Sequence, residues 1–201
     1  MIDKKKALFL PLLAGLFVVS CDSKARLAED IEGAWTSTPE QLQSSPGSQS
    51  TLVRVLDFRR ESGGAEGTVT VKALVTVDNV VGGDNVAEAP MSVTASGVAT
   101  ITGQYQAEDD DDLLITLDYT TMSVSVDPQG VMLSVNPLTN GESPDVETLK
   151  PAAVNLATQQ VTRAAQTAFS NVAKIEDIKI SKNLMSCEIG HKDLTFRKTA
   201  N

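Results

Sequence analysis

Strict alternation of apolar and polar residues over positions 68–78 is the strongest constraint that this sequence places on its fold. Along this stretch the side chains on one face are all apolar, and most of those on the other face are polar; the apolar ones are Val69, Val71, Ala73, Val75 and Val77. A period of two with many β-branched residues predicts a half-buried β-strand. Similar alternation predicts further strands at 52–60, 92–106, 113–119, 122–126 and 131–135, and three short strands at 175–181, 184–189 and 193–198.

One segment between these strands has a different period. Apolar residues recur every three or four positions in it, at Val154, Ala157, Val161, Ala164, Ala168 and Val172. This spacing predicts one amphipathic helix over about 144–173, capped by Ser143 and either kinked or started at Pro151. We expect the helix to dock as a lid over a sheet or over the end of a barrel, since its small residues allow close approach.

The predicted elements define the fold class. A chain of 201 residues suits one domain, or two very small ones. About eight to ten antiparallel strands joined by hairpin turns, with one long helix inserted before the last strands, indicate a mainly β protein built as a sandwich or a closed barrel.

The N-terminus has the features of an export signal. Lys4, Lys5 and Lys6 precede an apolar stretch over 7–19, which is shorter than the ~20 residues that span a bilayer. It ends in Val18-Val19-Ser20-Cys21, which resembles the bacterial lipobox. We therefore expect residues 1–20 to be a signal peptide and Cys21 to carry the lipid. Residues 21–30 would then be a lipidated tether and 31–201 the folded domain, held in the cell envelope and facing the periplasm rather than the cell surface.

The charge of the chain limits its partners. The net charge is −9, and removal of residues 1–20 takes away three lysines and one aspartate, so the mature charge would be −11. Nucleic-acid binding needs a clustered basic surface, which this sequence lacks. The expected membrane contact is therefore the lipid on Cys21.

Two short motifs carry a family resemblance. Gly33-Ala34-Trp35 opens the first strand of the folded domain, and Arg197 lies in the last strand. A Gly-x-Trp at the first strand, with an arginine of the terminal strand stacked on the indole, resembles the lipocalin and calycin superfamily, including small lipocalin-like lipoproteins of Bacteroidetes-type bacteria. The resemblance implies an antiparallel lipocalin-like β-barrel with Trp35 and Arg197 as a cation–π pair at its closed end. The sequence departs from the animal proteins in placing the helix before the last three strands.

We assign structural roles to the charged and potentially reactive residues. Residues 108–112 are all acidic but lack the spacing of a calcium loop, so we interpret them as a solvated hairpin tip. His191 is the single histidine, and we place it in an exposed turn. Arg54, Arg59 and Arg60 are assigned to ion pairs, with an anionic head group as the alternative partner. We expect Cys187 to be a small buried hydrophobe, and we predict no catalytic residue, no metal and no cofactor.

Two functions remain open after these considerations. In the first, the barrel binds a small apolar or amphipathic molecule between the strand faces at Val71, Val75, Ile115, Leu117 and Tyr119. In the second, the barrel is filled by its own side chains and the protein is a non-catalytic structural or interaction lipoprotein. An enzyme built around His191 is a third and weaker hypothesis. The sequence leaves the oligomeric state open.

Overall fold

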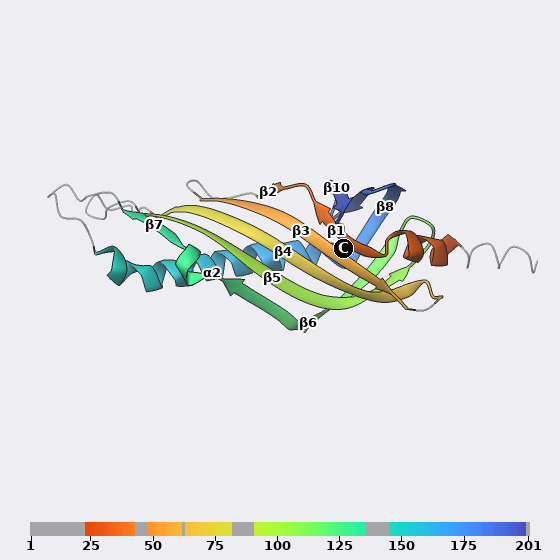
Figure 1. Ribbon diagram of the computed structural model, residues 1–201, viewed down its shortest axis with the longest axis horizontal. Coiled ribbons are helices and arrows are strands. Elements are labelled where there is room, and N and C mark those ends of the chain that lie inside the picture. The colour runs from red at the N-terminus through yellow and green to blue at the C-terminus, as the bar shows by residue number, and fades with distance from the viewer. Residues whose placement is uncertain (1–22, 43–47, 62, 82–90, 136–144, 200–201) are drawn as a thin grey trace, which may run out of the picture.

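The fold is a long antiparallel sheet that curves beside one long helix, as seen in the computed structural model (Figure 1). The structure describes residues 23–42, 48–61, 63–81, 91–135 and 145–199. Its strands are β1 (Gly33–Ser37), β2 (Glu40–Leu42), β3 (Ser48–Arg60), β4 (Glu66–Val81), β5 (Met91–Ala107), β6 (Leu113–Val126), β7 (Met132–Val135), β8 (Lys174–Ser181), β9 (Leu184–Ile189) and β10 (Asp193–Lys198). The helix α2 (Val146–Ser170) leads into the short 3₁₀ helix η2 (Asn171–Ala173), and η1 (Pro128–Gly130) precedes β7. Within the described part of the chain the sheet has ten strands, which agrees with the expected mainly β class.

The strand order shows how the sheet is connected. Its neighbours run β1-β10-β9-β8-β6-β5-β4-β3-β2, with β7 added beside β5. Strand β1 pairs with β10 on one side and also with β3, so Trp35 lies opposite both Lys198 and Leu56. The first and last strands of the chain are therefore joined to the long hairpin of β3 and β4.

The predicted strands are present, with the segments predicted at 113–119 and 122–126 joined in the single strand β6, and the long strands extend beyond their predicted ends. Strand β4 continues to Glu66 and Val81 and pairs along its whole length with β5. The apolar face of β4 is almost fully buried, as alternation predicts, and belongs to a single core cluster with the inner faces of the other strands.

Helix α2 lies along the sheet and not over its end. Figure 1 shows it running along the long axis of the molecule, and its neighbours include β4, β5 and β6. Its buried side chains are mostly small, namely Ala153, Ala157, Val161, Ala165, Ala168 and Phe169. Close packing also requires Gly97 on β5, where an added Cβ would lie 2.8 Å from a methyl group of Val161. The helix is capped by Asp145 with Pro151 inside it, while the predicted cap Ser143 lies outside the described residues.

Residues 23–30 form a helix against the end of the sheet, at the opposite end of the long axis from the start of α2 (Figure 1). Leu27 and Ala28 are buried, and Ile31 just beyond the helix is fully buried. Residues 23–30 therefore do not form the tether that we expected over 21–30. The reason is that Leu27, Ala28 and Ile31 recur at helical spacing and give the segment an apolar stripe.

Candidate functional site

The proposed ligand residues lie in three different environments. Val71 and Val75 are each 1% exposed and Ile115 is 4% exposed, so the protein's own side chains cover them. Leu117 is half-buried against the core. Tyr119 is 54% exposed, so its side chain lies outside the buried interior that holds the other predicted ligand residues.

A bulge in β6 explains the position of Tyr119. Thr100 lies opposite Ser123 while Thr102 lies opposite Asp118, so residues 119–122 face a single residue of β5. The Asp118 carboxylate accepts hydrogen bonds from the backbone N–H and the hydroxyl of Thr120, which stabilises the bulge. The bulge interrupts the regular alternation of side chains between the two faces. Alternation along residues 118–122 therefore does not predict which of these residues face the interior.

The indole of Trp35 is covered by a lysine. The ammonium of Lys198 lies 5.1 Å from the centre of the indole ring, within the range of a cation–π contact. Arg197, which we expected there, pairs across the ladder with Thr36 and is exposed. Adjacent residues of a strand point to opposite faces. The side chain of Arg197 therefore lies on the outer face, and that of Lys198 lies on the inner face with Trp35.

The glycine of the Gly-x-Trp motif has a physical role in this contact. Gly33 adopts a φ of +108°, and a Cβ there would lie 3.2 Å from Cε of Lys198. The indole N–H donates a hydrogen bond of 2.6 Å to the carbonyl of Ile31. The motif thus fixes the indole and leaves room for the lysine stem.

A buried ion pair lies among the apolar inner side chains of the sheet. Arg54 on β3 is 3% exposed and donates from Nη1 to Oε1 of Glu40 on β2. Its backbone N–H donates to the hydroxyl of Ser37 at 2.9 Å. The cross-strand row opposite Arg54 consists of Ala73 and then Ala99, and these small residues leave room for its long side chain.

The pair is incompletely satisfied. Nε of Arg54 and Oε2 of Glu40 are buried without a hydrogen-bond partner among the described residues. A buried polar atom without a partner costs about 1–3 kcal/mol, and more when it is charged. Sequence reasoning assigned Arg54 to an ion pair, which is confirmed. Its position on the inner face was visible as alternation with Leu56 and Phe58.

Two other buried groups lie in this interior. Burial, opposed by the charge of Arg54, raises the pKa of the Cys187 thiol to about 12. Burial and the charge of Glu32 raise the pKa of Tyr105 to about 12, and the Tyr105 hydroxyl has no partner among the described residues. Cys187 is 4% exposed, which confirms that it is a small buried residue, and the neutral thiol is a poor nucleophile.

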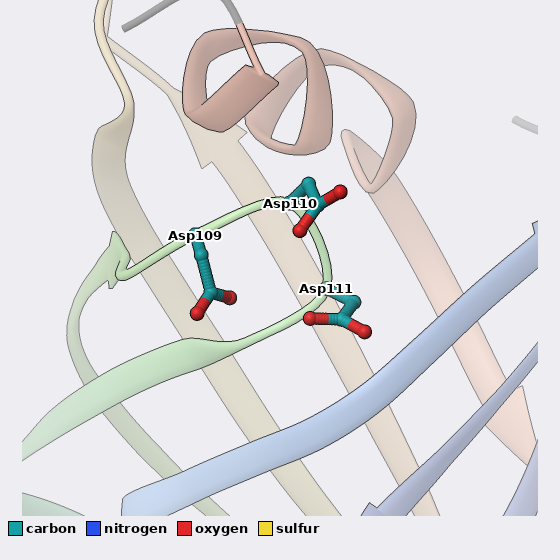
Figure 2. A group of neighbouring side chains, drawn as sticks. All are labelled: Asp109, Asp110 and Asp111. Carbon is teal, nitrogen blue, oxygen red and sulfur yellow. The ribbon is translucent and has the colours of Figure 1, made fainter. Parts of the chain in front are cut away.

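The acidic residues of the loop between β5 and β6 lie at the end of the molecule where residues 23–30 dock. Figure 2 shows Asp109, Asp110 and Asp111 around this loop, with ligand atoms within 4.8 Å of one another, a spacing that could hold a metal ion. The pKa of Asp111 is raised by partial desolvation and by the charges of Asp110, Asp109 and Asp112. Asp112 forms a 2.9 Å ion pair with Lys174 of β8, so the loop is held against the sheet. Asp109 and Asp110 are exposed, as expected for a hairpin tip.

The remaining predicted residues are placed as follows. The His191 side chain is almost fully exposed in a turn, 3.3 Å from Glu188. Arg59 pairs with Asp57 and Arg60 with Glu29. Cys21 and the signal segment lie outside the described residues.

Two surface cavities lie away from the predicted ligand residues. One of about 410 Å³ is formed by β1, β9 and β10 around Thr36, Leu184 and Arg197. Another of about 260 Å³ lies beside Glu66, Gln104 and Thr116.

No protein-family model matches the sequence, and no curated protein matches it. None of the helices in the described ranges is both long enough and apolar enough to cross a bilayer.

Proposed function

We propose that this protein is a non-catalytic lipoprotein of the bacterial envelope, anchored through Cys21 and facing the periplasm. We further propose that its sheet closes into a lipocalin-like barrel that binds a small amphipathic molecule. The pairing of β1 with both β10 and β3 supports closure, because it links the first strand of the order to β3, which lies next to the other end. The lysines, the apolar stretch and Cys21 at the N-terminus support the anchor.

The observation that carries the binding function is the Arg54–Glu40 pair inside an apolar cluster. A buried guanidinium with an unpaired N–H, on a residue that shares its face of the sheet with the buried Ala73, Ala99 and Leu56, suits a molecule with an apolar body and an anionic head. Arginine binds carboxylate and phosphate groups through several N–H donors at once. The Glu40 carboxylate occupies one of these donors in the structure. We therefore place the head of the ligand at Arg54 and not at Tyr119.

A filled interior is the second candidate function. The nearly complete burial of Val71 and Val75 favours it, since the protein's own side chains already cover these positions. In this case the barrel would serve as a rigid body for contact with another envelope protein.

Native mass spectrometry of the protein purified gently from its own host separates the two functions. The binding function predicts a bound anionic amphiphile that is lost in Arg54→Met and retained in the matched surface variant Arg59→Met, since the Arg59 side chain is 76% exposed. Glu40→Gln frees Arg54 and should retain or strengthen binding. Fluorescence of the single tryptophan, Trp35, reports whether each variant is folded.

Two results would count against the binding function. A wild-type protein that carries no small molecule, even after incubation with palmitate or with a lysophospholipid, favours the filled barrel. A ligand that stays bound to folded Arg54→Met protein shows that the head group lies elsewhere. Comparison of palmitate with the lysophospholipid distinguishes a carboxylate head from a phosphate head.

A further inference from the structure

The short distance between the proposed anchor and the folded body restricts how the protein can sit on a membrane. Cys21 precedes the first described residue, Ser23, by two positions. Two residues span at most about 7 Å of extended chain. A lipid on Cys21 would therefore hold the headgroup region close to residue 23.

Residue 23 lies in a helix that is fixed to the body of the protein. Leu27 and Ala28 are buried, and the carboxylate of Glu29 lies 3.6 Å from the guanidinium of Arg60 at the end of β3. The carbonyl of Ile31 accepts the indole N–H of Trp35. Buried apolar residues, an ion pair to β3 and a following residue bonded to β1 hold this helix in one orientation on the body.

The acidic loop lies at the same end of the molecule as this helix, as both figures show. The loop cannot swing away freely, because the N–H of Ile178 on β8 donates to the carbonyl of Asp111 at 2.9 Å. Its exposed carboxylates, Asp109 and Asp110, thus lie at the same end of the molecule as residue 23. The start of α2 lies at the far end of the long axis (Figure 1).

We propose that the protein stands end-on at the bilayer, with the Asp109–Asp111 loop facing the headgroups and the start of α2 directed away from the membrane. The acidic end fits a surface of zwitterionic headgroups, because anionic lipids repel carboxylates within a Debye length. This inference rests on the proposed lipidation of Cys21. To the proposed anchoring it adds the orientation of the protein on the bilayer and the zwitterionic class of lipid that its membrane-facing end prefers.

Quenching of a fluorescent label by lipids with a nitroxide headgroup tests the orientation. The full lipidated protein carries Asp110→Cys or the matched variant Glu147→Cys, each of which replaces an exposed acid, and is inserted into phosphatidylcholine vesicles. The unsubstituted protein is the labelling control, since Cys21 is blocked by its lipid and Cys187 is 4% exposed. We expect several-fold stronger quenching at 110 than at 147. Adding phosphatidylglycerol should reduce the quenching at 110, and salt should restore it.

The outcomes separate this inference from the anchoring proposal. Mass spectrometry of the purified protein first establishes whether Cys21 is acylated, and an unacylated Cys21 overturns both proposals. Equal quenching at the two positions, or stronger quenching at 147, in acylated protein overturns the orientation alone. Quenching at 110 that is insensitive to phosphatidylglycerol overturns the stated lipid preference.

Discussion

At the scale of single residues, charge burial has the largest consequences in this protein. The Arg54–Glu40 pair lies where β3 and β2 meet, and it ties the three-residue strand β2 to a long strand. Removing one partner of a buried pair leaves the other charge without compensation, whereas replacing both by apolar groups removes the desolvation cost as well.

Substitution of Arg54 alone should therefore destabilise the protein strongly. We expect Arg54→Met to lower the free energy of unfolding by about 3–5 kcal/mol. The double variant Arg54→Met/Glu40→Leu should recover much of this loss. Urea unfolding followed by Trp35 fluorescence measures both effects, with Arg59→Met as the surface control. A loss for Arg54→Met no greater than that of the control would show that the pair does not stabilise the fold.

The Cys187 thiol should make stability decline at high pH. Its pKa is raised from 9.0 to about 12 in the folded protein, so above pH 9 the unfolded chain loses a proton that the folded protein keeps. Stability is then fully present below pH 9 and falls as the pH rises toward 12. Urea midpoints measured across this range should fall less steeply for Cys187→Ala. Equal slopes for the two proteins would refute the assignment. Tyr105 and Lys174, whose pKa values are also raised, contribute to the slope that remains.

At the scale of elements, the contact between α2 and β5 decides how closely the helix approaches the sheet. Gly97 faces Val161 of α2 and Val126 of β6, and each of these valines would have a methyl group 2.8 Å from an added Cβ. Real Cβ atoms need more space than this, so any side chain at 97 must displace the helix or a neighbouring strand.

Gly97→Ala should lower the free energy of unfolding by about 1–3 kcal/mol because it overpacks this contact. The same substitution should cost less in a Val161→Ala background, since the smaller side chain makes room for the new methyl group. Val98→Ala, a change on the exposed face of β5, is the matched control. A double-mutant cycle with no coupling between positions 97 and 161 would contradict this packing.

At the scale of the whole molecule, the two ends of the long axis have different roles. The end with residues 23–30 and the acidic loop is the proposed membrane end, and the end with the start of α2 is distal (Figure 1). The strands between them share one hydrophobic cluster, so the ends are parts of one body.

Loss of the lipidated cysteine should release the protein from the membrane without unfolding it. In cells expressing the full chain, Cys21→Ser should abolish incorporation of labelled palmitate and move the protein from the membrane fraction to the aqueous fraction. Its unfolding midpoint should match that of the wild-type body. Cys187→Ser is the control for loss of a thiol as such, and it should keep the label. Retention of the Cys21→Ser protein in the membrane fraction would disprove anchoring through this residue.

The local pattern of this sequence determined most of its elements, although it predicted neither β2 nor the helix over 23–30. Apolar residues alternate along 68–78 and recur every three or four residues along 154–172. Both periods reflect local backbone geometry, which depends on neighbours in the chain, so they can be recognised without a tertiary structure. Strands β9 and β10 begin and end where the pattern placed them. Tertiary structure decided what no local pattern contains: that β1 joins both β10 and β3, that Lys198 and not Arg197 covers Trp35, and that the bulge at 119–122 exposes Tyr119. These outcomes depend on the register between segments distant in sequence, and a shift of one residue in register exchanges the two faces of a strand.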